Sequence, residues 1–503
     1  GAARRQSKIH DEGLGVGGWG VGDDARGGGG AGAARRQSKI QNPKSKIRYL
    51  VLLGDAVHTA HFSIGSGTKL AMEDAIALAG ALEQYPDLAM ALNAYELERK
   101  PVVETFQKAG QESQTYFETL KRYLNLDPVP FTFQLLTRSG RITYDDLRLR
   151  DTRFGELVDR VFAPPAAGPA PVAPVVVAAP PLFAPLALRG LRLANRVGVA
   201  PLSTCPALDG APPAGYAELL GRYVGGGAGL VLTEPVAVAA DGRTTPGALG
   251  LYAEAHLAAW TRVVAAVQAH APARIALQLG HAGRRGATRP RAEGLDRPLR
   301  TGGWPLLAAS ALPYTPTSPV PRAMDRAAMD RVRDDFVRAT QLAAAAGVDL
   351  LVLQMAQGYL LASFLSPLTN QRADAYGGDL PARLRYPLEV LDAVRAAWPA
   401  DKPLAVALSG GDFAKGGAGI EEAVASARVL RAHGCDLVVV QAGQTVPDSE
   451  PPYGRGFLTP LSDRIRNEAG IPTLVGGYLT TSNDVNTILA AGRADLCVLE
   501  AGL

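Results

Sequence analysis

The sequence has few cysteines, no long apolar run free of charge and proline, and little excess of charge of either sign. Its three cysteines, Cys205, Cys435 and Cys497, are widely spaced and odd in number. That pattern fits neither a disulfide framework nor a zinc cluster, so we expect no metal and a reducing, cytoplasmic environment. The most apolar stretch, residues 163–188, is crowded with prolines and cannot form a spanning helix. We therefore expect no membrane association.

The charge balance also bears on partners. The chain carries 52 basic and 48 acidic side chains, for a formal net charge of +4, and no Lys/Arg-rich block has interleaved aromatic residues. A nucleic-acid-binding protein normally shows such a basic footprint, so we expect no nucleic acid partner. At 503 residues the chain is too long for one ordinary core, which favours two domains with connecting material.

Two segments have compositions that no packed core explains. Residues 1–44 are rich in Gly, Arg and Ser and contain GAARRQSKI twice, at 1–9 and at 32–40. Such low complexity predicts disorder. Residues 163–181 are dominated by Pro and Ala, which predicts a semi-rigid linker and a domain boundary.

The intervening residues 45–162 show the pattern of a partial α/β domain. An apolar run at 49–53 predicts a buried strand, and the loop after it contains Gly and His. Helical periodicity follows at about 69–82 and again at about 88–124. Strand, loop and helix in this order indicate an α/β unit.

After the linker, eight short apolar runs alternate with helical stretches. Continuous apolar strands are buried on both faces, and eight βα units in roughly 320 residues predict a (β/α)8 TIM barrel over residues 182–503. A doubly wound sheet is the alternative. The longest insertion, residues 281–324, follows the third run. The runs are NRVGVAP (195–201), GLVLTEP (229–235), RIALQLG (274–280), LLVLQM (350–355), PLAVALS (403–409), LVVVQA (437–442), PTLVGG (472–477) and LCVLE (496–500).

The string GDAVHTAHFSIGSGTKLAMEDA at 54–75 combines an Asp after the predicted strand, a glycine-spaced loop and a helix start. Gly65 and Gly67 allow close backbone approach to a ligand, and a helix N-terminus favours negative charge. Asp55 is a candidate acceptor for a sugar or ribityl hydroxyl. His58 and His61 have two interpretations, a role at the site or a loop histidine satisfied by backbone groups.

This string resembles the second flavin-binding motif of the single-component aromatic hydroxylases, through its Gly-Asp, its His, its Gly pair and Glu-Asp-Ala. The resemblance implies that Gly54 and Asp55 lie by the ribityl chain of FAD, and that Ser66, Gly67 and Thr68 lie by the flavin pyrimidine edge. The family also needs a βαβ unit with G-x-G-x-x-G, which this sequence lacks. We therefore expect residues 45–162 to be the C-terminal part of such a domain and to hold FAD poorly or not at all.

The strand ends of the predicted barrel are polar, and active sites of such barrels lie there. The strings NRVGVAPLS, IALQLGHAGRRG, GYLLASFLSPLTNQRADAYGGDLPARLRYPLEVLDAVR and GRADLCVL resemble the old yellow enzyme family. The resemblance implies FMN as cofactor and NAD(P)H as reductant. It places Pro201 and Ser203 against the flavin ring, Gln278 at its pyrimidine edge, Gly477 at the phosphate and Tyr359 as proton donor.

A hydroxylase-type motif, a linker and this barrel in one chain together resemble the bifunctional anthraniloyl-CoA monooxygenase/reductase and salicylyl-CoA 5-hydroxylase group. That resemblance implies an oxidoreductase that hydroxylates and reduces an aromatic acyl-CoA thioester, and a homodimer is possible. Two alternatives stay open. The chain is a simple ene-reductase that acts on enones, or a relative that binds a ligand without turnover.

Several positions depart from the old yellow enzyme pattern. Two histidines usually end the fourth strand and polarise the substrate carbonyl, but this chain has Gln354 and Gln357, which cannot become cationic. Ala407 stands where an arginine usually lies by the flavin, and Glu500 stands where the family usually continues into Gly-Arg, whose arginine binds the FMN phosphate. The sequence ends at Leu503, so we expect the barrel to be truncated at its C-terminus. Weaker FMN binding and weaker activation of the substrate follow from these changes.

Overall fold

The computed structural model describes residues 50–163, 178–201, 206–270 and 272–499. Ser203, Cys205 and Glu500, and with them the predictions made for these residues, lie outside the described residues. The chain divides into two compact units by its internal contacts. Unit 1 comprises residues up to Lys121 together with Arg138–Ile142, and unit 2 comprises Arg122–Thr137 and everything from Thr143 onwards. The division therefore falls inside the predicted segment 45–162.

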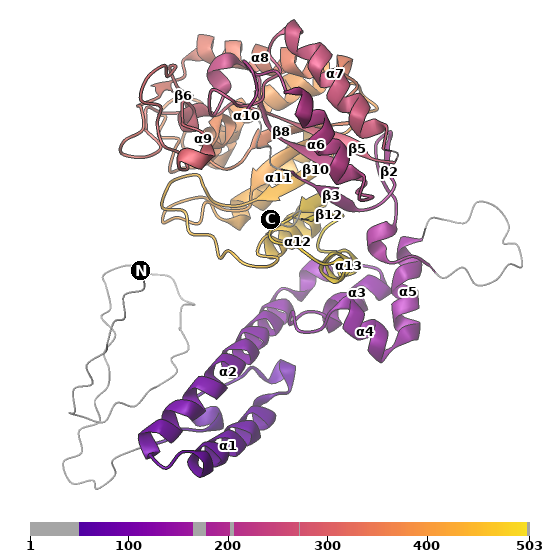
Figure 1. Cartoon of the computed structure of the whole chain (residues 1–503), viewed down its shortest axis with the longest axis vertical. Helices are drawn as coiled ribbons and strands as arrows, with labels where there is room; N and C mark the ends of the chain where they lie inside the picture. The colour runs from indigo at the N-terminus through magenta and orange to yellow at the C-terminus, as the bar shows by residue number, and fades with distance from the viewer. Residues whose placement is uncertain (1–49, 164–177, 202–205, 271, 500–503) are drawn as a thin grey trace, which may run out of the picture. The chain divides into compact units, whose positions relative to one another are not determined.

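Unit 1 is built on two packed helices, α1 (Gly67–Gln84) and α2 (Leu88–Glu118), drawn in indigo in Figure 1. Two 3-10 turns, η1 (Gly54–Ala56) and η2 (Phe62–Ile64), precede them. Helix α2 begins at the cap Asp87, whose carboxylate accepts from Met90 N at 2.9 Å. Both predicted helices are confirmed.

The strand predicted at 49–53 was wrong for the described part, residues 50–53, which have no regular secondary structure. Val51 and Leu53 instead pack against a small core formed by Ala81, Ala91 and Tyr95 of the two helices. An apolar run becomes a strand only when a second strand pairs with it, and here helices provide the burial.

Unit 2 contains a closed barrel of eight parallel strands, which confirms the predicted fold class. Each predicted run supplies one strand, and the strands follow one another around the barrel in chain order. The short hairpin of β1 (Leu186–Leu188) and β2 (Leu191–Leu193) was not predicted. The barrel strands are β3 (Val197–Val199), β4 (Leu230–Ala237), β5 (Arg274–Gly280), β8 (Leu350–Met355), β9 (Leu404–Ser409), β10 (Leu437–Gln441), β11 (Thr473–Val475) and β12 (Leu496–Leu499).

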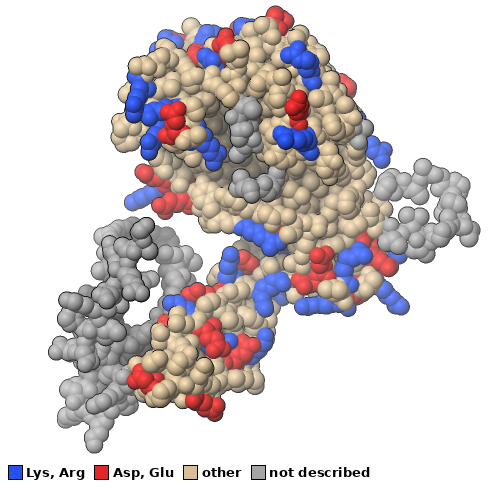
Figure 2. All heavy atoms as spheres, in the orientation of Figure 1, with Lys and Arg blue, Asp and Glu red and all other residues tan. Residues whose placement is uncertain are grey.

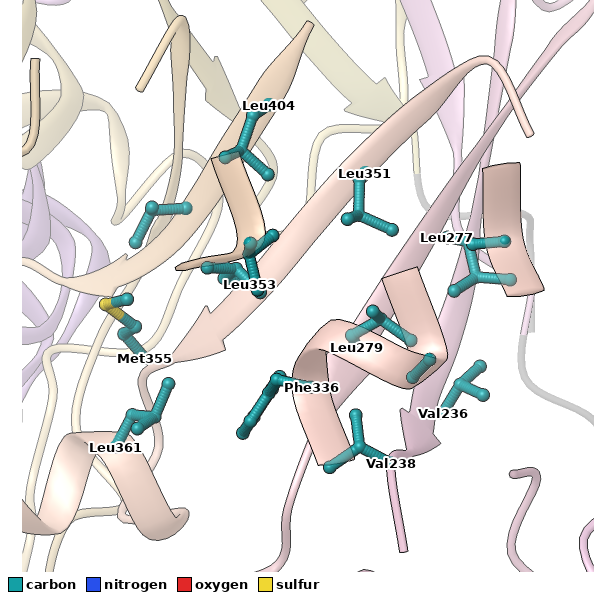
Figure 3. Packing of buried hydrophobic residues seen from close by; sticks show 14 of the residues in the cluster. Val236, Val238, Leu277, Leu279, Phe336, Leu351, Leu353, Met355, Leu361 and Leu404 are labelled. Atoms are coloured by element: carbon teal, nitrogen blue, oxygen red, sulfur yellow. The ribbon is translucent and has the colours of Figure 1, made fainter. Parts of the chain in front are cut away.

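Helices cover the outside of the barrel, as Figure 1 shows. A large apolar core fills the layer between helices and strands, and Figure 3 shows Phe336 of α8 facing Leu279 and Val238 within it. The insertion after β5 carries the short pair β6 (Leu307–Ala308) and β7 (Arg322–Ala323). The helices are α6 (Ala214–Val224), α7 (Glu254–Gln268), α8 (Arg326–Ala345), α9 (Leu360–Leu365), α10 (Leu380–Ala397), α11 (Ile420–Ala432), α12 (Thr459–Ala469) and α13 (Ser482–Ala490).

Three further helices precede the barrel in sequence but belong to unit 2: α3 (Pro128–Leu136), α4 (Tyr144–Arg150) and α5 (Thr152–Phe162). Polar contacts attach them to barrel helices. Tyr123 donates to Asp463 of α12 at 2.5 Å, and Tyr144 N donates to Thr487 of α13 at 2.9 Å. The residues before the predicted linker are thus partly an extension of the barrel unit.

Two surface properties complete the description. On the face shown in Figure 2, basic side chains lie beside acidic ones over the barrel, and no large visible area carries one sign alone. Within the described ranges, no helix has both the length and the hydropathy needed to span a bilayer.

Candidate functional site

The inside of the barrel changes from apolar to polar towards the C-terminal ends of its strands. Alternate residues of a strand share one face, so Leu350, Val352 and Gln354 of β8 all point inward. The first two belong to an apolar inner core with Ala276 and Val439. The hairpin residues Leu188, Leu191 and Leu193 belong to the same core and close it. By the same alternation, Gln278, Gln354 and Gln441 form a polar layer at the opposite end.

These three glutamines each have a buried amide atom without a hydrogen-bond partner among the residues that the structure describes. The atoms are Gln278 Oε1, Gln354 Nε2 and Gln441 Oε1. The other amide atom of Gln278 donates to Thr233 O, and Gln354 Oε1 accepts from Ala356 N at 3.1 Å. An unsatisfied buried amide atom costs about 1–3 kcal/mol. The layer therefore suits a ligand with both donors and acceptors, such as the pyrimidine edge of a flavin.

Three of the predicted flavin-binding residues lie in this region. Gln278 is buried on β5, and Pro201 is buried just after β3. Gly477 follows β11 with a φ of 92°, in the left-handed region, and a Cβ there would lie 3.0 Å from the Phe457 ring. A side chain at Gly477 would be strained and crowded, so the glycine keeps the backbone accessible at this strand end. Their roles towards FMN stay predictions.

The structure brings Gln354 and Tyr359 together but not Gln357. Gln354 and Tyr359 line one cavity of about 260 Å³, whereas Gln357 is not among its lining residues. Gln357 has a φ of 58°, and its carbonyl accepts from Arg285 Nη1 at 2.6 Å. Burial raises the pKa of Tyr359, against the lowering effect of Arg285. Tyr359 is thus a neutral hydroxyl at neutral pH, as a proton donor has to be.

Ala407 brings no charge to this layer. It is fully buried on β9, in register with Gln354 on one side and Val439 on the other. Where the family pattern places a guanidinium, the barrel interior holds a methyl group. The polar layer is therefore neutral at this position.

Two adjacent arginines fix the insertion beside the strand ends. Arg284 donates to Pro313 O of the insertion at 3.3 Å and to Thr445 O at 2.7 Å. Burial lowers its pKa to about 10. The Arg285 guanidinium pairs with Asp296 at 2.8 Å and lies 4.5 Å from the Tyr314 ring centre. From the sequence these arginines could be identified only as polar residues at the end of a strand, because the residues that they contact lie far along the chain.

Sequence reasoning also missed His281 as a site residue. It directly follows β5, is buried, and lines the same cavity as Gln354 and Tyr359. The string HAGRRG contained the signal, but it served only to identify the family pattern. Asp241 lies next to it, with Oδ1 at 3.8 Å from His281 Nε2.

The hydroxylase-like motif of unit 1 forms a loop held by a buried carboxylate. Asp74 of α1 accepts from Gly54 N at 3.1 Å, from His58 Nε2 at 2.5 Å and from Arg99 Nε at 2.9 Å. Burial opposes ionisation of Asp74, but the bonds from Arg99, His58 and Gly54 outweigh it and lower the pKa of this carboxyl. His58 therefore has a structural partner, but this partner is the Asp74 carboxylate and not the backbone group that the structural interpretation expected.

The other predicted FAD residues surround the start of α1. Asp55 and Thr68 are exposed, and Gly67 begins the helix. A Cβ on Gly67 would lie 3.8 Å from Asp55 Oδ1, so that carboxylate lies next to the helix N-terminus. Ser66 is buried and donates to Ile64 O at 3.2 Å. The His61 ring contacts Ser63 at 2.7 Å. Whether these residues bind FAD stays a prediction.

Comparisons with known proteins cover the barrel. Residues 181–499 match the NADH:flavin oxidoreductase / NADH oxidase family. The chain is 33% identical over 320 residues to NADPH dehydrogenase of Geobacillus thermodenitrificans, covering 63% of this chain and 89% of that protein. It is 34% identical over 321 residues to NADPH dehydrogenase of Listeria innocua, with the same coverage.

Among solved structures, morphinone reductase superposes with a TM-score of 0.54 at 27% identity, covering 64% of this chain and 86% of that one. A 2-naphthoyl-CoA reductase in complex with 2-naphthoyl-CoA gives a TM-score of 0.58 at 24% identity, and the chain covers 50% of its length. The latter likeness concerns the fold alone.

The family match begins at residue 181, so the predicted hydroxylase character of residues 45–162, and FAD with it, stays outside it. For the barrel, the family match, the relatives and the polar layer of glutamines agree. FMN supplies hydride when bound, and NAD(P)H supplies it to FMN. The chain belongs to the NADH:flavin oxidoreductase / NADH oxidase family of the old yellow enzyme type, and it is an NAD(P)H-dependent flavin oxidoreductase.

Proposed function

We propose that the barrel reduces a carbon–carbon double bond conjugated to a carbonyl in a small, uncharged substrate. The observation that carries this proposal is the unpartnered Gln354 Nε2 in the cavity that Tyr359 also lines. The amide donor suits a carbonyl oxygen, and the hydroxyl suits proton transfer to the carbon next to that carbonyl, while hydride goes to the far carbon of the double bond. Pro201, Ser203, Gln278 and Gly477 would hold FMN.

The lining of the cavity favours an uncharged substrate. Apart from His281, Gln354, Tyr359 and Thr244, its described lining consists of small or apolar residues. Among the described residues no lysine, arginine or carboxylate lines it, so a phosphate or carboxylate placed inside would have no counter-charge from them.

A second candidate is the hydroxylation and reduction of an aromatic acyl-CoA thioester. The arrangement of Asp55 beside the N-terminus of α1 in unit 1 favours it, because such a site suits a flavin ribityl chain. In that case Gly54, Ser66, Gly67 and Thr68 would belong to an FAD site. A third candidate, ligand binding without turnover, is favoured by Ala407 and by the glutamines at 354 and 357.

One experiment separates the three candidates. The protein is loaded with FMN, reduced with NADPH under anaerobic conditions, and mixed with cyclohex-2-enone or with a benzoyl-CoA-type thioester. Reoxidation by the enone alone supports the first proposal, and reoxidation by the thioester, or hydroxylation of the thioester once O2 is admitted, supports the second. Stabilisation of the protein by the enone or the thioester, without oxidation of NADPH, supports the third. No flavin binding after reconstitution with FMN and FAD would refute all catalytic candidates.

Variants test the assigned roles. Tyr359→Phe removes the proton donor and Gln354→Leu removes the amide donor, and each is expected to lower kcat/KM for the enone by roughly 10- to 100-fold. Bleaching of FMN by NADPH should be much less affected. Equal loss in both half-reactions would contradict the assigned roles and indicate a damaged barrel.

A further inference from the structure

The hydrogen bonding of His281 fixes which of its ring nitrogens carries a proton. Gly283 N donates to His281 Nδ1 at 3.1 Å. In a neutral imidazole one nitrogen accepts and the other carries the hydrogen. Nδ1 is the acceptor here, so His281 presents an N–H group at Nε2.

That N–H group has no hydrogen-bond partner among the residues that the structure describes. The nearest carboxylate oxygen, Asp241 Oδ1, lies at 3.8 Å, beyond hydrogen-bond distance. The other oxygen of Asp241 is engaged by Arg331 of α8 at 2.8 Å. His281 is 2% exposed, so water outside the protein does not satisfy Nε2 either. A buried donor in this state is available to a ligand.

His281 and Gln354 come from adjacent strands and face the same cavity. A Cβ on Gly280, the residue before His281, would lie 3.2 Å from Gln354 Cβ, which shows how closely the end of β5 packs against this glutamine. The cavity thus holds two unpartnered N–H donors, Gln354 Nε2 and His281 Nε2, and no carboxylate among its lining residues. Two donors complement an oxygen with two lone pairs, and a carbonyl oxygen is such a group.

We propose that His281 Nε2 is a second hydrogen-bond donor to the substrate carbonyl, beside Gln354, and that it stabilises the negative charge that develops on this oxygen. The inference rests on the proposed enone reduction and deepens it. In the family pattern two histidines polarise the substrate carbonyl, and this chain has Gln354 and Gln357 in their place. The proposal gives an imidazole at the end of β5, that of His281, part of this role. A neutral imidazole is sufficient for this task, because it donates a hydrogen bond without transferring the proton.

Two substitutions separate the two ring nitrogens. In His281→Asn the short amide oxygen replaces Nδ1 as acceptor for Gly283 N, whereas in His281→Gln the longer side chain brings an amide nitrogen to the place of Nε2. A donor role predicts that H281Q retains kcat/KM for cyclohex-2-enone within about threefold and that H281N loses about 10- to 100-fold. A merely structural role through Gly283 predicts the reverse order, and that order would overturn the proposal.

His256 offers a matched control. It is similarly buried, its Nδ1 accepts from Tyr252 N at 3.4 Å, and it does not line the cavity. H256N and H256Q should leave the ratio of the two kcat/KM values near one. If the same preference for Gln appears there, the effect comes from general packing and the proposal is wrong.

A binding measurement keeps the proposal testable if enone reduction itself fails. Cyclohexanone has the carbonyl without the double bond, and its dissociation constant is obtained from the perturbation of the bound flavin spectrum and from thermal shift. We expect H281N to weaken cyclohexanone binding at least threefold and H281Q to keep it. Binding that is equal in all variants would refute the role of His281. Binding with this preference, but without enone turnover, would refute only the proposed function.

Discussion

A buried aspartate from each unit can be compared, and the pKa values of the two carboxyls are shifted in opposite directions. Asp74 of unit 1 lies between the Arg99 guanidinium and His58, which hold its pKa below the ordinary value. Asp463 of unit 2 accepts from Tyr123 at 2.5 Å and from Asn467 at 2.7 Å, both neutral groups. Burial raises its pKa, although Arg493 opposes this effect.

The difference follows from the size of the surrounding core. Unit 1 has only small apolar clusters, one of them formed by Leu70, Val103 and Phe106. An ion network there connects the loop, α1 and α2. The barrel has two large apolar cores, and its buried polar groups beside them are mostly amides and hydroxyls. A small unit buries little apolar surface, so breaking a buried ion pair there should cost it a larger share of its stability than the loss of a neutral hydrogen bond costs the barrel.

The largest expected effect comes from breaking the charged arrangement. Asp74→Asn removes the negative charge and leaves Arg99, 6% exposed, with Glu73 as its remaining acidic partner among the described residues. Breaking a buried ion pair costs about 3–5 kcal/mol, so the helices of unit 1 should lose protection in hydrogen exchange. The control is Glu73→Gln, because Glu73 is partly exposed and its loss should cost about 1 kcal/mol. Equal effects of the two variants would show that burial does not decide the strength of this network.

The next largest effect is expected when a charge is inserted into the polar layer of glutamines at the C-terminal ends of the barrel strands. Ala407→Arg places a guanidinium beside Gln354. A charge-assisted hydrogen bond to reduced FMN is worth about 1.5–3 kcal/mol, which for a two-electron couple raises the midpoint potential by about 30–60 mV. Spectroelectrochemistry measures this shift. Ala407→Met adds volume without charge and should leave the potential unchanged; an equal shift in both variants would exclude an electrostatic origin.

The barrel could be predicted from the sequence because each of its strands is a continuous apolar run. The polar pairings could not, since they join residues that are distant in sequence. Tyr123 and Asp463 are 340 positions apart, and Arg99 follows Asp74 by 25 positions in a helix that looked merely amphipathic. The strand predicted at 49–53 was wrong because this run has the composition of a strand but packs on helices. Gln354 and Tyr359 were foreseen through the family pattern, whereas His281 required the tautomer that Gly283 imposes.

The smallest effect on stability is expected from a substitution of Asp463, because burial already disfavours the ionised form of this carboxyl. Its raised pKa means that its contribution to stability is complete below the pKa of the unfolded chain, about 3.9, and is lost as pH rises through the folded pKa. Asp463→Asn stays neutral at every pH, and Gln134 Oε1, which has no partner within the described ranges, is available to accept from the new amide. We expect the unfolding free energy at pH 7 to change by at most about 1 kcal/mol.

The pH dependence is the sharper measurement at this site. Urea unfolding at pH 5 and at pH 8, followed by the fluorescence of Trp260, Trp304 and Trp398 in unit 2, gives the two free energies for wild type and variant. The wild type should lose more stability between these pH values than Asp463→Asn, because only the wild type has to retain or release a proton at this position. An identical loss in both proteins would mean that Asp463 is ionised in the folded state throughout. The two buried aspartates would then both be charged, and the contrast between the units would rest on core size alone.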